Sequence, residues 1–265
     1  MGQGPRWQGQ QRRIGLTGGI ATGKSTVGQL LEGKGLPVLD ADQYAREALA
    51  PGSPGAAAVL ERFGDAVRTS GTSLECPTID RGALGSIVFS DAAEKRWLEQ
   101  LVHPLVRQRF DQALAALKAE PAVVLMIPLL FEAGLQELCS EIWLVDCDEA
   151  QQLERLIQRD RLMSRDDLSR ADADARISAQ WPLSEKRRLS DAFIGNNGSR
   201  EHYREQVTKL LLKASPGEEE LQGCSYPTDE TASILNNRVD DRRKDYRNSD
   251  YLPPDNRATS SLDKQ

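Results

Sequence analysis

Residues 18–25, Gly-Gly-Ile-Ala-Thr-Gly-Lys-Ser, match the pattern G-x-x-x-x-G-K-[ST] of a loop that binds phosphates. Glycines in such a loop let backbone N–H groups turn towards the β- and γ-phosphates, and the N-terminus of the following helix adds partial positive charge. Lys24 would reach the phosphate oxygens, while the hydroxyl of Ser25 would bind Mg²⁺. The pattern predicts a site for a nucleoside triphosphate and Mg²⁺, the alternative being an ordinary glycine-rich turn, but it does not identify a second substrate.

Two acidic residues, Asp40 and Asp42, end the second predicted strand. Ligands of open parallel sheets bind at the carboxyl ends of the strands, and residues two apart in an extended segment face the same side. One carboxylate would orient the Mg²⁺ shell, and the other would accept a proton from an attacking hydroxyl. The alternative is that Asp42 is only a helix N-cap.

Two arginines four residues apart, Arg155 and Arg159, share one face of a predicted helix. They suit a lid that closes over phosphates, the alternative being a solvent-exposed face with ion pairs. The helix follows the apolar run 142–146, which ends in an acid as in motor-like ATPases, but the closely spaced arginines favour a lid over phosphates. The N-K-x-D sequence with which GTPases bind their base does not occur.

Short apolar runs alternate with helical patterns between residue 13 and about residue 215. Asp80 and Asp91 stand where helix N-caps belong. Strands separated by helices predict an α/β fold, with a five-stranded parallel sheet flanked by helices. A helical insertion over about 43–119 interrupts this alternation. We expect strands over 13–16, 37–39, 122–127, 141–145 and 192–194, and helices over 25–31, 42–48, 55–63, 81–89, 91–102, 105–118, 149–159, 172–180 and 199–213.

The composition excludes several classes of protein. A net charge of −6 speaks against broad binding to nucleic acid, and no run of 18 apolar residues predicts a helix through a membrane. Four cysteines without a C-x-x-C pair, and two histidines far apart, make a zinc site or a disulfide framework improbable. A cytoplasmic location fits this cysteine usage best.

The two ends of the chain differ from its body. Residues 1–12 are polar and rich in glycine and glutamine, and we predict a disordered leader there. Residues 216–265 are poor in apolar residues, interrupted by prolines and net acidic, so we predict a disordered tail. The alternative for the tail is a short motif that binds a partner.

Seven segments occur in an order that resembles the dephospho-coenzyme A kinase family, over about residues 13–213. The resemblance implies a P-loop kinase core, a helical coenzyme A-binding domain and a lid over about 155–180. It also implies transfer of the γ-phosphoryl group of ATP to the ribose 3′-hydroxyl of dephospho-coenzyme A, in a monomer or small homo-oligomer. The segments are LTGGIATGKSTV, LDADQYAR, VHPLV, IPLLFEAGL, QLERLIQRD, ARISAQ and DAFIGNNGS.

The resemblance also assigns roles to residues. Asp42, Lys24 and Arg155 would be catalytic, and Asp40 would lie near the metal with Ser25. His103 would either contact the substrate or cap a helix. The residues that would bind ATP are Gly18, Ala21, Thr22, Gly23, Lys24, Ser25, Thr26, Arg159 and Asn197, and those that would bind dephospho-coenzyme A are Asp42, Arg46, His103, Leu129, Glu132 and Gln180.

Two departures from the family pattern stand out. Position 21 is alanine where the family usually has glycine, and the lid stretch 163–175 is a few residues longer than usual. Other readings are another P-loop small-molecule kinase, acting on a nucleoside monophosphate or a sugar acid, or a nucleotide-dependent regulatory protein without catalysis. The intact Lys24, Ser25, Asp42 and Arg155 argue against the regulatory protein.

A chain that ends at Ser215 is expected to keep its melting temperature and its kinase activity. The tail is too polar to bury much apolar surface, so nothing offsets the entropy lost on ordering it. Thermal melting and an ADP-release assay on the full-length and shortened chains check this. Loss of soluble protein or of activity on truncation would show that the tail docks on the body.

Overall fold

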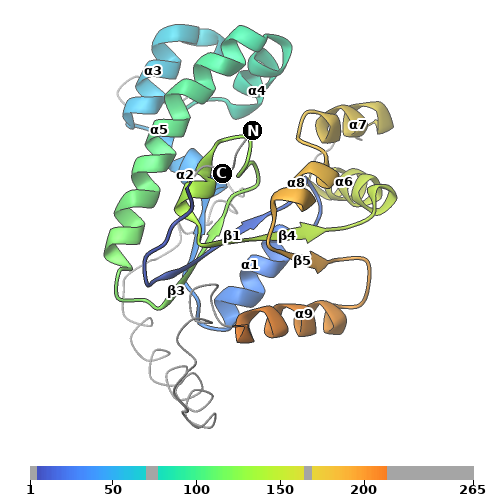
Figure 1. Cartoon of the computed structure of the whole chain (residues 1–265). Helices are drawn as coiled ribbons and strands as arrows, with labels where there is room; N and C mark the ends of the chain where they lie inside the picture. Colours follow the sequence, from blue (N-terminus) through green and yellow to red (C-terminus); the bar gives the residue numbers. More distant parts are fainter. Residues whose placement is uncertain (1–4, 70–76, 164–168, 214–265) are drawn as a thin grey trace, which may run out of the picture. The chain divides into compact units, whose positions relative to one another are not determined.

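The computed structural model describes residues 5–69, 77–163 and 169–213, and Figure 1 shows their arrangement. Their five parallel strands lie in the order β2-β3-β1-β4-β5, which confirms the predicted fold class. Each predicted strand is present to within two residues at its ends. The strands are β1 Arg12–Thr17, β2 Val38–Asp40, β3 Ala122–Met126, β4 Glu141–Asp146 and β5 Ala192–Gly195.

Nine α-helices and two short 3₁₀ helices lie in the described ranges. Asp80 and Asp91 are N-caps, as predicted, and their carboxylates accept backbone N–H bonds at the starts of α4 and α5. The helices are α1 Lys24–Gly33, α2 Ala41–Ala48, α3 Pro54–Phe63, α4 Arg81–Ser90, α5 Ala92–Ala116, α6 Glu149–Met163, α7 Arg170–Ser178, α8 Leu183–Leu189 and α9 Arg200–Leu212, and the 3₁₀ helices are η1 Gly64–Val67 and η2 Leu135–Leu138.

Helices cover both faces of the sheet (Figure 1). On one face, α1 and α9 pack against apolar side chains of β1, β3, β4 and β5, including the fully buried Trp143. On the other face, the second half of α5 packs on β3 together with Tyr44 of α2. This double coverage explains why the strands read as apolar runs without alternation.

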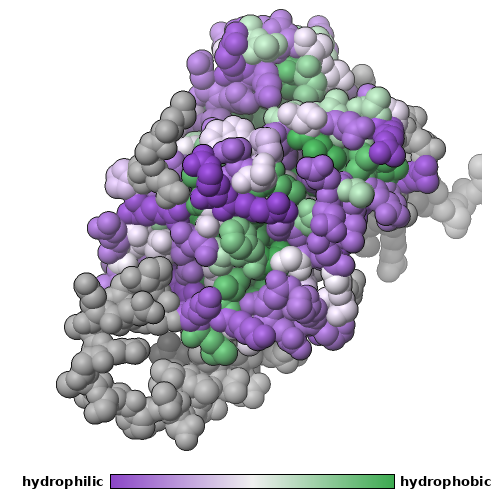
Figure 2. Space-filling view, turned by 45° about the vertical axis from the view of Figure 1, so that its right-hand side comes forward, coloured by the Kyte–Doolittle hydropathy of each residue, from purple (hydrophilic) through white to green (hydrophobic). Residues whose placement is uncertain are grey.

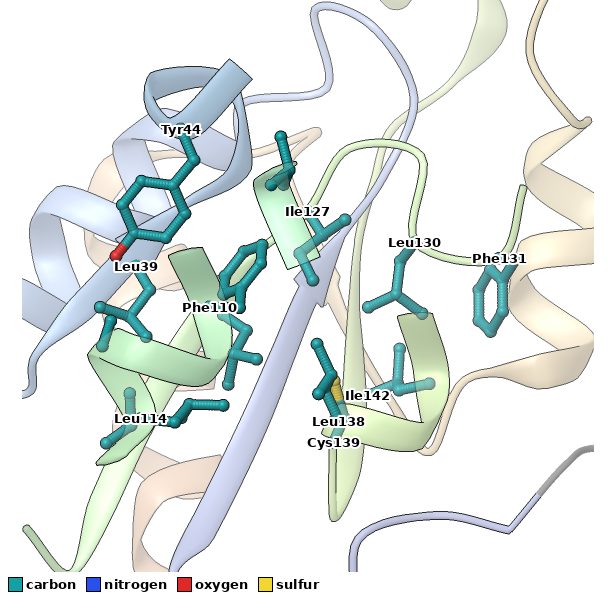
Figure 3. Close-up of a cluster of buried hydrophobic side chains, with 14 residues drawn as sticks. Leu39, Tyr44, Phe110, Leu114, Ile127, Leu130, Phe131, Leu138, Cys139 and Ile142 are labelled. Carbon is teal, nitrogen blue, oxygen red and sulfur yellow. The ribbon is translucent and has the colours of Figure 1, made fainter. Parts of the chain in front are cut away.

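The core on the α5 side reaches from the second strand to the segment after β3 (Figure 3). Tyr44 and Phe110 meet edge to face at one end, with ring centroids 5.0 Å apart. Leu130 and Phe131 lie at the other end of the view, on the segment that follows β3. The core therefore holds the residues after β2 and after β3 in fixed relation.

The surface of the described residues is mainly polar. On the face that Figure 2 shows, hydrophilic residues surround smaller hydrophobic areas. None of the described helices is both long and apolar enough to cross a membrane. The large apolar side chains that remain exposed among the described residues are Phe89, Leu129, Trp181, Phe193 and Leu212.

The prediction of separate helices over 91–102 and 105–118 is wrong. One helix of 25 residues, α5, runs through Pro104. A proline inside a helix costs about 3 kcal/mol because it removes a backbone hydrogen bond and clashes with the preceding turn. Burial of apolar side chains on both sides of Pro104, including Trp97 and Phe110, more than offsets this cost, at about 1.5–3 kcal/mol for each large side chain.

The prediction of a disordered leader over 1–12 is wrong for residues 5–12, the last of which begins β1. The backbone N–H of Trp7 donates to the carbonyl of Cys139 at 3.1 Å, and its indole N–H donates to the carbonyl of Gln11 at 2.9 Å. The guanidinium of Arg13 lies 3.4 Å from the centre of the Trp7 ring. One tryptophan supplies the apolar area that the rest of the leader lacks. Residues 1–4 and the predicted tail lie outside the described residues, as does part of the longer lid stretch (164–168).

Candidate active site

The predicted phosphate loop joins β1 to α1, and two of its positions require glycine. Gly18 has φ +153°, and a Cβ there would lie 2.5 Å from the carbonyl oxygen of Val145. Gly23 has φ +103°, and a Cβ there would lie 2.2 Å from the side-chain nitrogen of Asn196. Ala21 adopts φ +59°, a conformation in which glycine is unstrained, so the family's usual residue fits the same backbone.

Lys24 folds back over the loop. Its Nζ donates to the carbonyl oxygens of Gly18 at 2.8 Å and Gly19 at 2.6 Å. Burial, with the nearby charge of Lys186, lowers the pKa of Lys24 to about 8. A lysine whose charge is disfavoured by its surroundings gains most from an anionic partner, so phosphate bound here would restore its full charge.

Asp40, the last residue of β2, and Asp42, in the first turn of α2, make different interactions. Asp40 is the N-cap of α2, where its Oδ1 accepts the backbone N–H of Asp42 at 2.8 Å. The alternative that Asp42 is only an N-cap is therefore wrong. Burial first, and then the negative charge of Asp40, raises the pKa of the Asp42 carboxyl, while Lys24 and Arg159 oppose this shift. Asp42 is thus a stronger base than a free aspartate.

The two arginines predicted to belong to a lid interact with different groups. The charge of Arg159 acts on both Lys24 and Asp42. Arg155 instead donates to the backbone oxygen of Asn196 at 2.8 Å and to Gln151, and its buried NH1 has no hydrogen-bond partner among the described residues. Of these two arginines, Arg159 is therefore the one whose charge reaches both Lys24 and Asp42.

Three amide side chains form hydrogen bonds with the backbone of the loop, and two of them, Asn196 and Gln152, were not predicted from the sequence. The Nδ2 of Asn196 donates to the carbonyl of Thr22 at 2.7 Å, and the Nε2 of the buried Gln152 donates to the carbonyl of Ile20 at 2.9 Å. Gln180 was predicted to bind substrate, but its Oε1 accepts the backbone N–H of Ile20 at 2.9 Å. Three amides from distant segments thus fix the loop's shape.

The remaining predicted residues differ in their surroundings. Asn197 is exposed, and its Oδ1 accepts the backbone N–H of Asp148 at 3.0 Å. The charge of Arg46 acts on Asp42. Leu129 is exposed after β3. His103 lies exposed in the interior of α5, so the alternative that it caps a helix is wrong.

A buried ion pair joins the segment after β3 to α8. The Nζ of Lys186, which is fully buried, lies 2.8 Å from Oε1 of Glu132, and it also donates to the carbonyl of Pro128 at 3.3 Å. The same Oε1 accepts the backbone N–H of Trp181 at 3.1 Å. Glu132, predicted to bind substrate, therefore braces two segments. The sequence analysis missed Lys186 and α8 because the segment Leu183–Leu189 is mostly charged and looks solvent-exposed.

Replacing Lys186 by Met is expected to lower the free energy of unfolding by about 3–5 kcal/mol, because Glu132 keeps a poorly accessible charge without its partner. Urea unfolding measures the change. Arg188→Met is the matched control, since the pair Arg188–Glu185 is exposed and is worth about 0–1 kcal/mol. Equal, small effects in both variants would contradict a stabilising role for the buried pair.

The donor atoms present fit a magnesium ion that is held mainly by nucleotide phosphates. No group of three or more His, Cys, Asp or Glu residues in the described ranges could hold a metal by itself. Mg²⁺ usually takes one or two protein oxygens together with phosphates and waters. Ser25 is exposed in the first turn of α1, and the cap uses only Oδ1 of Asp40. Asp146, at the end of β4, adds a buried Oδ1 without a hydrogen-bond partner among the described residues.

Comparison with known sequences points to one family. A family model described as dephospho-CoA kinase matches residues 12–202. A dephospho-CoA kinase of Synechococcus sp. (strain CC9605) is 61% identical over 206 residues, which cover 78% of this chain and 94% of that relative. A dephospho-CoA kinase of Gloeobacter violaceus is 49% identical over 214 residues, which cover 80% and 97% of the two chains.

Solved structures agree with the sequence comparison. The crystal structure of TT1252 from Thermus thermophilus is 35% identical and superposes with a TM-score of 0.65, covering 77% of this chain and 97% of the other. A dephospho-CoA kinase from Campylobacter jejuni is 27% identical, with a TM-score of 0.54 and coverage of 78% and 98%. With a family match over most of its described length, and with close relatives that align nearly end to end, this chain belongs to the dephospho-CoA kinase family.

Proposed function

We propose that the protein transfers the γ-phosphoryl group of ATP to the ribose 3′-hydroxyl of dephospho-coenzyme A. The observation that carries this proposal is the place of Asp42 after β2, at the same edge of the parallel sheet where β1 leads into the phosphate loop, within a chain of this family. A base beside a phosphate-binding lysine is what transfer to an alcohol requires. Another small-molecule kinase would contain the same phosphate loop, but its sequence would not match the dephospho-CoA kinase family over residues 12–202.

The order of the strands supports separate sides for donor and acceptor. β1 is the central strand and leads into the phosphate loop. β2 and β3 lie on one side of it and lead into the start of α2 with Asp42 and into the segment with Glu132, where the acceptor would bind. β4 and β5 lie on the other side and end near Asn196 and Asn197, where we place the adenosine of ATP.

Asp42 would hold the acceptor hydroxyl in line with the γ-phosphate and take its proton as the new P–O bond forms. Lys24 and Arg159 would stabilise the charge on the transferring group, since their charges act at Asp42. Arg155 would bind phosphate from the side of Asn196, through the nitrogen that has no protein partner among the described residues. Closure of α6 and α7 would exclude water from these groups.

Ser25 and Asp40 would hold Mg²⁺ together with the phosphates. The ion supplies positive charge that neutralises the phosphate oxygens. The pantetheine arm of the acceptor would extend towards the helical insertion, past Arg46 and towards His103, with Leu129 at the entrance. We further propose a cytoplasmic monomer or small homo-oligomer that does not bind nucleic acid, in keeping with the free thiols of Cys139 and Cys147.

An ADP-release assay with Mg-ATP tests the proposed function. Dephospho-coenzyme A is offered alongside a panel of nucleoside monophosphates and sugar acids at equal concentration. Turnover should require dephospho-coenzyme A, and the product should carry the new phosphate on the ribose 3′-oxygen, as phosphorus NMR reports. Faster turnover of a nucleoside monophosphate or a sugar acid would reassign the enzyme to another kinase class.

A further inference from the structure

Trp181 is a large aromatic side chain that stays open to solvent in the connection between α7 and α8. It is 43% exposed, whereas its neighbour Phe131 is only 9% exposed. The two rings are nearly parallel, at 8°, with their centroids 6.5 Å apart. Phe131 lies at the end of the core opposite Tyr44 (Figure 3), so it is itself held firmly. A buried ring therefore supports one side of an indole whose remaining surface is available to a ligand.

Two hydrogen bonds hold the chain at Trp181 and at the residue before it. Its own N–H donates to Glu132 at 3.1 Å, and the buried Lys186 holds the same carboxylate at 2.8 Å. The preceding residue, Gln180, accepts the N–H of Ile20 in the phosphate loop at 2.9 Å. An exposed tryptophan at the tip of a loose loop would gain nothing from such bracing, whereas a preorganised binding surface would.

This indole lies next to the phosphate loop and to the segment after β3, where we place the acceptor. Gln180 ties it to the phosphate loop, and Glu132 ties it to the segment that follows β3. The charges of Glu132 and Lys186 both act on Lys24, so this corner lies close to the lysine of the phosphate loop. β3 lies between β1 and β2 in the sheet, away from the β4–β5 side where the adenosine of ATP is placed.

We propose that Trp181, supported by Phe131, stacks on the adenine of the acceptor dephospho-coenzyme A. This inference rests on the proposed function, because the hydroxyl that reacts belongs to the ribose that carries this adenine. Once that hydroxyl is at Asp42, its base must lie within one nucleoside's length of the reaction centre. Stacking of a base on an aromatic side chain strengthens binding by about 5- to 150-fold. Trp181 is thus a specificity residue for an adenosine-bearing acceptor.

The test compares Trp181→Ala, Trp181→Leu and Trp181→Phe with the unchanged protein, by calorimetric titration of dephospho-coenzyme A with ADP saturating the donor site. We expect Trp181→Ala to bind about 5- to 150-fold more weakly, Trp181→Leu to remain weak, and Trp181→Phe to recover most of the affinity, since phenylalanine restores a ring face. Affinity for ATP should not change in any of them. Phe193→Ala, at an exposed aromatic residue of β5, is the matched control and should bind as the unchanged protein does.

A spectroscopic readout separates contact from a structural role. Dephospho-coenzyme A should quench tryptophan fluorescence in the unchanged protein, and the quenching should disappear in Trp181→Phe although that variant still binds. Quenching that persists in Trp181→Phe would overturn the proposal. So would equal loss of affinity for ATP and the acceptor, or unchanged acceptor affinity in Trp181→Ala. Turnover of dephospho-coenzyme A by the unchanged protein is measured in parallel, and only its absence would contradict the proposed function itself.

Discussion

Asp42→Asn is expected to lower kcat with dephospho-coenzyme A by about 10²–10⁴-fold, the range that general-base groups contribute. Asparagine keeps the size and much of the hydrogen-bonding shape of the side chain, but it cannot take the proton. Affinity for Mg-ATP should hardly change, because the phosphate loop is untouched. Steady-state kinetics with a direct ATP titration measures both quantities.

The pH dependence gives a second signature of the same residue. Burial and the charge of Asp40 raise the pKa of Asp42 above the usual value for aspartate. A base must be deprotonated to work, so activity should fall as the pH drops through this raised pKa, at a higher pH than a free aspartate would give. The acidic limb of the rate profile should be absent in Asp42→Asn.

Two controls decide between a base and a metal ligand. Asp65→Asn changes an exposed acid of η1 and should leave both constants unchanged. Asp40→Asn keeps a good N-cap for α2 while it removes the charge, so it isolates the metal role without loss of the helix start. If Asp42→Asn weakens Mg-ATP binding and spares kcat, Asp42 is a metal residue and Asp40 becomes the candidate base.

Lys24→Ala is expected to lower kcat by about 10²–10³-fold, because it removes a cation that stabilises charge on the transferring phosphoryl group. The melting temperature should change little, since among the described residues the ammonium donates to two carbonyls of the loop and to no side chain of the core. Single-turnover kinetics and thermal melting check the two parts of this expectation.

Lys95→Ala, on the exposed side of α5, is the matched control and should retain full activity. The low pKa of Lys24, about 8, adds a further check. Phosphate restores the charge of this lysine, so ATP binding should take up protons near and above pH 8 in the unchanged protein, and not in Lys24→Ala. Near-normal turnover in Lys24→Ala would contradict the assignment of residues 18–25 as the working phosphate site.

Local patterns in the sequence determined the five strands, most helices and the phosphate loop. These features depend on neighbours within a few residues: apolar runs, capping aspartates at positions 80 and 91, and glycines at 18 and 23 whose positive φ no other residue tolerates as well. The single exception among the long helices is α5. A proline normally ends a helix, but α5 continues through Pro104 because it packs against two hydrophobic clusters, one on each side of that residue.

The tertiary structure decided which of the candidate residues face the reaction. Asp40 and Asp42 are equivalent by spacing, yet only the start of α2 makes one of them a cap. Arg155 and Arg159 share a helix face by pattern, yet contact with Asn196 separates their roles. Glu132 and Lys186 stand 54 residues apart, the difference of their numbers, and pair only because the segment after β3 lies against α8. Such contacts depend on chain segments distant in sequence, and no local pattern carries their pairing.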